Sequence, residues 1–199
     1  MSSLRVERLR AAGVHADELY LASGDCVAVH GPSGGGKTRL LRAIADLDEA
    51  DGEIWSDDHA RSTMTCPEWR ARVVFVAADS HWWLDRVGPH APAWSDELLA
   101  AVGFDRDVLD WSVSRLSSGE RQRLSLARAV TRTPGTLLLD EPTANLDAHN
   151  TERVEQLLSD WRLSSGGSIL WVSHDPEQRR RVASVSHPIV DGVLGPNDG

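Results

Sequence analysis

This 199-residue sequence predicts an α/β fold with a mostly parallel core sheet and flanking helices, and three observations support that prediction. Short apolar runs at 26–29, 73–77 and 136–140 are typical of strands buried on both faces. Segments with apolar residues at helical spacing lie between these runs, an alternation that indicates a parallel sheet covered by helices. A glycine-rich turn at 31–36 joins the first run to the first helix. We therefore expect one sheet with helices on both faces.

Local signals predict the individual elements. Two strands are expected within 18–30, on either side of the Ser23-Gly24-Asp25 turn. A helix is expected from Lys37 to Leu47, because apolar residues recur there at spacings of three and four: Leu40, Leu41, Ile44 and Leu47. Further strands are expected at 73–77, 136–140, 168–173 and 187–190, and further helices at 117–131, 148–163 and 175–183.

The whole chain, residues 1–199, is predicted to form a single domain. Within it, the segment 79–115 differs in composition from the rest. It contains two short helical stretches, near 95–102 and 105–111, and is predicted to be a short helical subdomain inserted in the core. It also carries half of the chain's 8 tryptophans: Trp82, Trp83, Trp94 and Trp111. These rings either pack in the subdomain's own core or form an exposed docking surface for a partner, since aromatic patches are typical of interfaces.

Charge and hydropathy limit the environment and the partners. The formal net charge of −9 argues against a nucleic-acid partner, which normally requires a basic patch. No apolar run approaches the roughly 20 residues that span a bilayer, and the N-terminus has no signal-peptide pattern, so we expect a cytoplasmic chain. Cys26 is expected to be a buried core residue and Cys66 to lie in a loop, so neither thiol is expected to be functional.

A phosphate-binding loop is predicted between the strand at 26–29 and the helix that follows. The pattern G-x-x-x-x-G-K-[ST] lets backbone N–H groups and a helix N-terminus converge on phosphate oxygens. The lysine adds a compact positive charge for the β- and γ-phosphates, and the final hydroxyl is a ligand for Mg²⁺. Lys37 is the only lysine among 21 Lys and Arg residues. The eight residues are Gly31, Pro32, Ser33, Gly34, Gly35, Gly36, Lys37 and Thr38.

Two acids end the apolar strand at 136–140 and predict a metal site and a hydrolytic group. Adjacent carboxylates at the end of a buried strand are costly unless a cation or a substrate uses them. Asp140 is expected to hold Mg²⁺ together with Thr38. Glu141 points the other way on an extended backbone and is expected to polarise a water molecule that attacks the γ-phosphate.

Three further motifs resemble those of the ATP-binding cassette (ABC) ATPases. Leu116-Ser117-Ser118-Gly119-Glu120 resembles the family's LSGGQ signature, and Thr143-Ala144-Asn145-Leu146-Asp147 looks like its D-loop. Ser173-His174-Asp175 follows a predicted strand and looks like the family's switch histidine. Their order and spacing match the family from about residue 4 to 193. The sequence therefore resembles an ABC-type P-loop cassette, whose fold also has an N-terminal antiparallel β part.

The resemblance implies the arrangement of the working protein. Two cassettes, expected to be a homodimer, pack head to tail, and each ATP lies between the phosphate-binding loop of one subunit and the signature of the other. In this sequence the signature contacts would come from Ser117, Ser118, Gly119 and Glu120. Their position at a helix start agrees, because its N–H groups form a second anion site. Glu141, His174 and Lys37 are the expected catalytic residues, with ATP and Mg²⁺ as cofactors.

Two functions remain compatible with the motifs. The first is an ATP-binding subunit that powers a separate transmembrane permease and lies on the inner face of the cell membrane through that partner. The second is an ABC ATPase with a mechanical role outside transport. The DNA-repair relatives insert a long coiled coil between the two halves of the site, and no heptad pattern occurs between Lys37 and Leu116. The sequence favours the transport role.

The sequence departs from the family at several positions. The family's Mg²⁺-contacting glutamine aligns with Ala78, so Asp79 or Ser80 is a hypothetical replacement. The aromatic ring that the family stacks on adenine has no clear equivalent, since Tyr20 is expected to lie in the core. The signature also has Ser118 and Glu120 where the family has glycine and glutamine.

Overall fold

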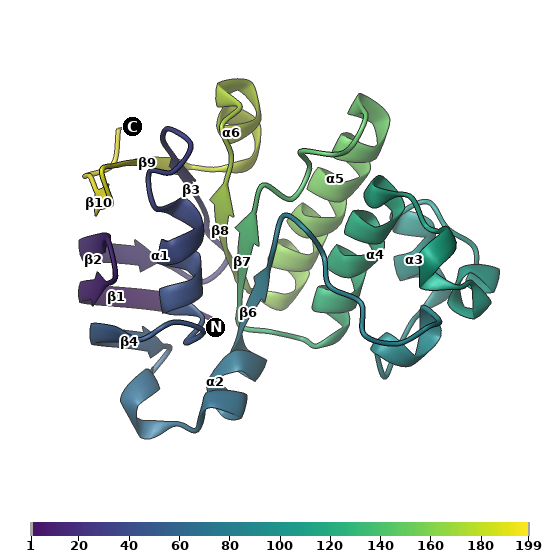
Figure 1. The fold of residues 1–199 in the computed structure, drawn as a ribbon, viewed down its shortest axis with the longest axis horizontal. Helices are drawn as coiled ribbons and strands as arrows, with labels where there is room; N and C mark the ends of the chain where they lie inside the picture. Colours follow the sequence, from purple (N-terminus) through teal and green to yellow (C-terminus); the bar gives the residue numbers. More distant parts are fainter. Residues whose placement is uncertain (1, 199) are drawn as a thin grey trace.

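The computed structural model describes residues 2–198, which form one ten-stranded sheet with helices on both sides (Figure 1). The strand order is β5-β4-β1-β2-β10-β9-β3-β8-β7-β6. The five strands from β9 to β6 pair in parallel, as predicted for the core. They are β9 (Val185–Val190), β3 (Cys26–His30), β8 (Ser168–Val172), β7 (Thr136–Asp140) and β6 (Val73–Val76). The α/β prediction is confirmed.

The N-terminal half of the sheet is antiparallel, as the family resemblance implied. It contains β1 (Leu4–Ala11), β2 (Val14–Leu21), β4 (Ala50–Ser56) and the short β5 (His59–Ala60). The last strand, β10 (Val193–Leu194), pairs with both β2 and β9 and so joins the two halves. The C-terminal end of the chain therefore completes the sheet beside its N-terminal part.

Tyr20 corrects a prediction. Side chains alternate across β2, and Leu19 and Leu21 take the core-facing positions. Tyr20 consequently points to solvent and is 56% exposed. It is not part of the core.

The helices occupy the expected places with small differences. They are α1 (Lys37–Ile44), α4 (Ser118–Thr131), α5 (Ala148–Ser165) and α6 (Pro176–Val182). The first helix ends three residues earlier than predicted, because Asp46 takes a left-handed backbone conformation with φ of 58°. Leu47 therefore leaves the apolar face and is 39% exposed.

A further helix, α2 (Cys66–Arg72), occupies a region expected to be a loop around Cys66. Its start is a capping box: Thr65 and Glu68 satisfy each other's backbone N–H groups, and Pro67 suits the first turn. The other cysteine, Cys26, is buried as predicted, and burial raises the pKa of its thiol to about 12. That thiol is therefore unreactive at neutral pH.

The segment 79–115 forms a small helical lobe against α4, at the right of Figure 1. It contains α3 (Asp96–Ala101) and 3₁₀ turns at Gly88–His90, Arg106–Asp110 and Val113–Arg115, and the turn at Arg106–Asp110 replaces the second predicted helix. Trp82, Trp94 and Trp111 pack against the lobe's core, whereas Trp83 is 64% exposed. Core packing is thus confirmed for three of the four rings, and the docking alternative stays a prediction for Trp83.

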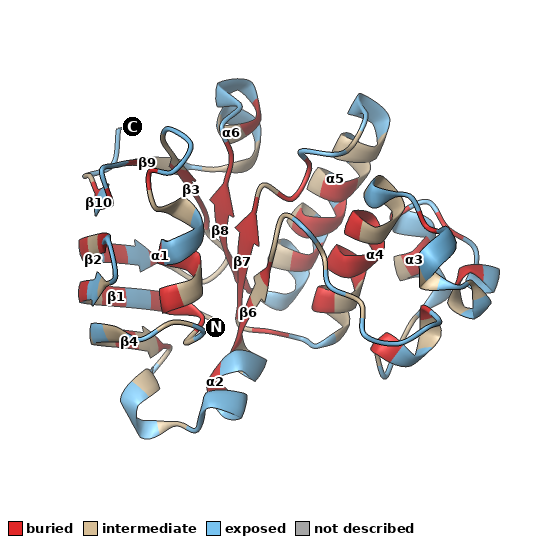
Figure 2. Cartoon of the chain, viewed as in Figure 1, coloured by how far each residue is buried: buried red, intermediate tan, exposed pale blue. Residues whose placement is uncertain are grey.

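Two apolar cores cover the two faces of the parallel strands, and Figure 2 shows the buried inner surfaces of the helices facing the sheet. One core joins α1 to the antiparallel strands, and the other joins α4 and α5 to β7 and β8. Every residue of β7 and β8 is buried. The loops after these strands are therefore held on a rigid edge.

Candidate functional site

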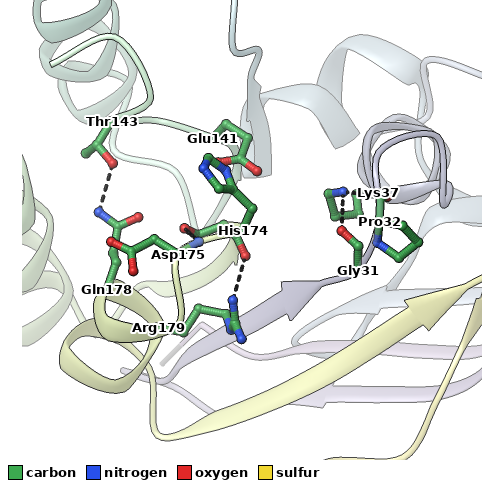
Figure 3. A network of polar contacts seen from close by, with 10 residues as sticks. Gly31, Pro32, Lys37, Glu141, Thr143, His174, Asp175, Gln178 and Arg179 are labelled. Carbon is green, nitrogen blue, oxygen red and sulfur yellow. Dashed lines mark hydrogen bonds and ion pairs between the residues drawn. The ribbon is translucent and has the colours of Figure 1, made fainter.

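The predicted motifs meet at the carboxyl ends of adjacent parallel strands. The phosphate-binding loop (residues 31–38) follows β3, His174 follows β8, and Glu141 follows β7. Because β3, β8 and β7 are neighbours in the sheet, their carboxyl ends share one edge. Ligands of open α/β sheets bind at this edge. Figure 3 shows Lys37, Glu141 and His174 reaching it from three separate segments.

The phosphate-binding loop has a shape that glycine alone allows. Gly31 has φ of 150°, and a Cβ there would lie 2.1 Å from the Ile189 carbonyl oxygen. Gly36 has φ of 103°, again in the region that favours glycine. Lys37 Nζ donates to the carbonyl oxygens of Gly31 at 2.9 Å and Pro32 at 3.0 Å. The loop therefore curls around the ammonium group.

The predicted metal ligands are in direct contact. Thr38 Oγ1, in the first turn of α1, donates to Asp140 Oδ2 at 2.7 Å. Asp140 ends β7 and is 6% exposed. A hydroxyl and a single carboxylate beside a phosphate-binding loop fit Mg²⁺, which takes hard oxygen ligands from one or two side chains and from substrate phosphates. The two residues predicted for the metal thus form a suitable donor pair.

Glu141 and His174 form a second pair at the same edge. His174 Nδ1 lies 2.9 Å from Glu141 Oε2. Glu141 has φ of 47°, which is unusual for a residue with a side chain, and its N–H donates to the Val172 carbonyl oxygen of β8. Strained backbone of this kind persists where neighbouring structure fixes it, often at functional sites. The prediction of an extended backbone at Glu141 is therefore wrong, and from this left-handed conformation its carboxylate meets the histidine.

The signature residues begin α4, with Ser117 as its N-cap. The Ser117 backbone N–H donates to Glu120 Oε2 at 2.7 Å, and the Glu120 N–H donates to Ser117 Oγ at 3.2 Å. This capping box uses one backbone donor of the turn for the Glu120 carboxylate. Ser117 and Ser118 are exposed, while Gly119 packs against the D-loop, where an added Cβ would lie 3.1 Å from the Asn145 carbonyl oxygen.

Replacing Glu120 by glutamine tests the role of this charge. The hydrogen bond from the Ser117 N–H lowers the pKa of Glu120, so the carboxylate is charged at neutral pH. Glu120→Gln keeps an acceptor for the cap but removes a negative charge from an exposed helix start. We expect the ATP concentration that gives half-maximal hydrolysis to fall by about threefold to tenfold. Glu97→Gln, in the first turn of α3, is the control, and an unchanged or higher concentration for Glu120→Gln would refute the prediction.

The structure also shows residues beside the site that the motifs did not reveal. The Asp191-Gly192 turn between β9 and β10 lies against the phosphate-binding loop, and the Gly192 N–H donates to the Gly35 carbonyl oxygen at 3.1 Å. An Asp-Gly pair between apolar residues is a hairpin signal that could have predicted this turn. Buried Gln178 also lies near the site, and no local pattern in the sequence marks it.

The departures from the family pattern lie beside the site. Ala78 is the second residue after β6, and its side chain carries no polar group. Asp79 is exposed, and its proposed role in place of the family's glutamine stays a prediction. Weaker Mg²⁺-dependent hydrolysis by Asp79→Ala would support that role. Gln122 of α4, 2% exposed, reaches this segment and donates to the Ala77 carbonyl oxygen at 3.5 Å.

Comparison with known proteins identifies the family. The family model "ABC transporter" matches residues 14–144. The chain belongs to the ABC transporter ATP-binding family. It is an ABC-type ATPase, and the ABC assignment made from its motifs is confirmed. Residues 2–198 contain no helix whose length and hydropathy would suit a membrane crossing.

Curated relatives cover most of this ABC ATPase. It is 35% identical to the aliphatic sulfonates import ATP-binding protein SsuB of Escherichia coli O6:H1, over 89% of this chain and 71% of the relative. It is 37% identical to the protein of that name from Mycobacterium sp. strain MCS, over 88% and 72%. The molybdenum import ATP-binding protein ModC of Aromatoleum aromaticum is 32% identical over 88% of this chain and 51% of ModC.

Solved structures confirm the cassette fold. A dimeric ATP-binding cassette in a post-hydrolysis state with ADP and Pi superposes with a TM-score of 0.82 at 23% identity, covering 98% of this chain and 97% of the other. An ATP-binding subunit of an ABC transporter superposes with a TM-score of 0.88 at 17% identity, covering 98% and 88%. These likenesses extend over both halves of the sheet and the helical lobe.

Proposed function

We propose that two copies of this ABC ATPase close head to tail around two ATP molecules and that ATP hydrolysis drives a separate membrane permease. Each ATP would lie between residues 31–38 of one copy and Ser117–Glu120 of the other. The observation that carries the proposal is the meeting of Lys37, the Thr38–Asp140 pair and the Glu141–His174 pair at one sheet edge. The exposed start of α4 then offers donors to a phosphate on a neighbouring copy.

Each group of residues at this sheet edge would have a separate role in ATP hydrolysis. Lys37 and the loop N–H groups would bind the β- and γ-phosphates and offset the charge that develops during transfer. Mg²⁺ held by Thr38 and Asp140 would neutralise phosphate oxygens. Glu141 would orient the attacking water, and His174 would hold the Glu141 carboxylate while its ring faces the γ-phosphate. Closure of the second copy would exclude bulk water from this site.

The membrane partner is proposed from the relatives, which are named as import ATP-binding proteins. The relatives are named for different imported substances, aliphatic sulfonates and molybdenum, although their identities to this chain are similar. We infer that the cargo is selected by the partner and not by the ATPase. The ATPase would then lie on the cytoplasmic face of the membrane through the permease.

A groove beside the helical lobe is the proposed docking place for the permease. It has a volume of about 560 Å³ and lies between β6, α4 and the lobe. Trp83, Leu47 and Phe75 supply apolar surface. Among residues 2–198 the lining includes no carboxylate and five basic side chains, of which Arg42 is already paired with Asp48 outside the lining: Arg42, His81, His90, Arg128 and Arg132. An apolar helix with one or more acidic residues is the partner segment that this lining fits.

Arg128 organises the groove. Its guanidinium lies over the rings of Trp82 at 4.5 Å and Trp83 at 4.9 Å and donates twice to the His81 carbonyl oxygen. Burial and the nearby Arg132 lower the pKa of Arg128 to about 10, so the group stays charged at neutral pH. A desolvated cation without a carboxylate partner favours an acidic group from outside the chain.

Trp83→Ala tests the docking proposal. We expect the variant to bind ATP with wild-type affinity but to lose capture of an integral membrane protein from detergent-solubilised membranes, because Trp83 is the exposed ring of the groove. Leu163→Ala is the control, since Leu163 is 71% exposed on the distant end of α5. Equal capture by all three proteins would place the permease contact elsewhere, and weakened ATP binding by Trp83→Ala would mean that the ring supports the fold.

A further inference from the structure

We infer that Gln178 is a positioning residue for ATP hydrolysis, holding the segments that carry Glu141 and His174 at a fixed separation. The inference rests on the roles proposed above for those two residues. Gln178 lies on α6, on the side of His174 away from Lys37, and Figure 3 shows its amide directed at Thr143. It would act through Glu141 and His174 without touching the nucleotide.

Gln178 is buried and uses both hydrogens of its amide group. It is 4% exposed, and its Nε2 donates to Thr143 Oγ1 at 2.8 Å and to Glu155 Oε1 at 2.8 Å. Thr143 is 9% exposed and belongs to the D-loop. A buried amide with two well-made hydrogen bonds fixes the groups that it joins, because breaking either bond leaves a polar atom without a partner.

These contacts close a ring around the catalytic pair. Thr143 lies two residues after Glu141, and Gln178 lies four residues after His174, about one helical turn away. The Thr143–Gln178 hydrogen bond closes the ring on one side, and the His174–Glu141 contact at 2.9 Å closes it on the other. Within residues 2–198, the Thr143–Gln178 bond is the one side-chain hydrogen bond between α6 and the segment 141–147.

The catalytic pair needs such restraint because its own side chains are accessible. The His174 side chain is 73% exposed and the Glu141 side chain 21% exposed. Neither is confined by packing alone, so the separation of their backbones decides whether the 2.9 Å contact forms. Displacements of about 1 Å can lower a catalytic rate by orders of magnitude. The ring therefore predicts an effect on the rate of the chemical step and little effect on ATP binding.

The other contacts of α6 allow a clean substitution. Glu155 also accepts hydrogen bonds from Arg181 Nη2 at 2.9 Å and Arg181 Nε at 3.2 Å. Gln178→Leu therefore leaves the Glu155 carboxylate paired and fills a similar volume. Thr143→Val removes the hydroxyl acceptor with nearly the same shape, and Gln178 keeps its bond to Glu155.

The experiment compares steady-state ATP hydrolysis and nucleotide affinity in a mutant cycle. We expect Gln178→Leu and Thr143→Val each to lower kcat about tenfold, with KM and ATP affinity within about twofold of wild type. The double variant should be no slower than the slower single variant, because both changes remove the same Thr143–Gln178 hydrogen bond. Thr143→Ser keeps an acceptor and should restore most of kcat. Arg180→Gln, an exposed change on the same helix, should hydrolyse ATP like wild type.

Two outcomes would overturn the inference: unchanged kcat in both single variants, or losses that multiply in the double variant. ATP affinity reports folding, and Thr143→Val carries the test if Gln178→Leu does not fold. A failure of the proposed function looks different. Wild-type hydrolysis rates in both Glu141→Gln and His174→Ala would remove the pair from the chemistry, whatever Gln178 variants do.

Discussion

Glu141→Gln should lower ATP hydrolysis to below about 1% of the wild-type rate while ATP affinity stays within about twofold. The amide keeps the size of the side chain and can still contact His174, but it no longer polarises the attacking water. Lys37 and residues 31–36, which bind the phosphates, are unchanged. Steady-state hydrolysis with Mg²⁺ and equilibrium binding of ATP would measure the two effects separately.

The same variant tests the proposed dimer. If each ATP joins two copies, ATP that is bound but not hydrolysed should hold them together. We expect light scattering to report a dimer for Glu141→Gln with ATP and Mg²⁺, and a monomer without nucleotide. Glu177→Gln, an exposed glutamate change on α6, is the matched control and should not trap a dimer. A Glu141→Gln protein that stays monomeric at saturating ATP would exclude the homodimer and leave a heteromer of related cassettes.

Lys37→Ala should weaken ATP binding on the order of 100-fold and abolish measurable hydrolysis. The ammonium group sits inside the loop, bonded to the carbonyl oxygens of Gly31 and Pro32, and no other lysine exists in the chain. Arginine should not restore function, because its planar fork does not fit where a compact charge is enclosed.

Arg39→Ala is the control for Lys37→Ala, since Arg39 is an exposed cation in the same first turn of α1. Titration of a fluorescent ATP analogue gives the affinities, and thermal unfolding shows whether the fold survives. Wild-type ATP affinity in Lys37→Ala would contradict the assignment of residues 31–38 as the phosphate-binding loop.

The parts of the site that could be predicted are those encoded by neighbouring residues. Residues 31–38 and Asp140-Glu141 each have a characteristic residue pattern at the end of an apolar strand. Local spacing alone therefore identifies them as site residues. The order of β3, β8 and β7 in the sheet then brings them together. Their pairing, Thr38 with Asp140, agrees with the roles predicted from that spacing.

The parts that could not be predicted depend on distant contacts. Gln178 gains its position from Thr143 and Glu155, which no periodic pattern links to it. β1 and β4 escaped detection individually because the alternation is broken: Arg8 has φ of 52°, and the β1–β4 register shifts between Glu7 and Arg10. Leu47 satisfied the helical spacing, but a left-handed residue ended the helix before it.

The hairpin of β9 and β10 has a consequence for how the nucleotide site comes into being. During synthesis the glycine-rich loop leaves the ribosome before Ile189 and Gly192, which press against it and follow only after the intervening strands and helices. A nascent chain can thus display every motif and still lack the scaffold that gives the loop its curvature. The ability to bind a triphosphate should therefore arise only once the β9–β10 hairpin has been made, so a shorter nascent chain should not consume ATP.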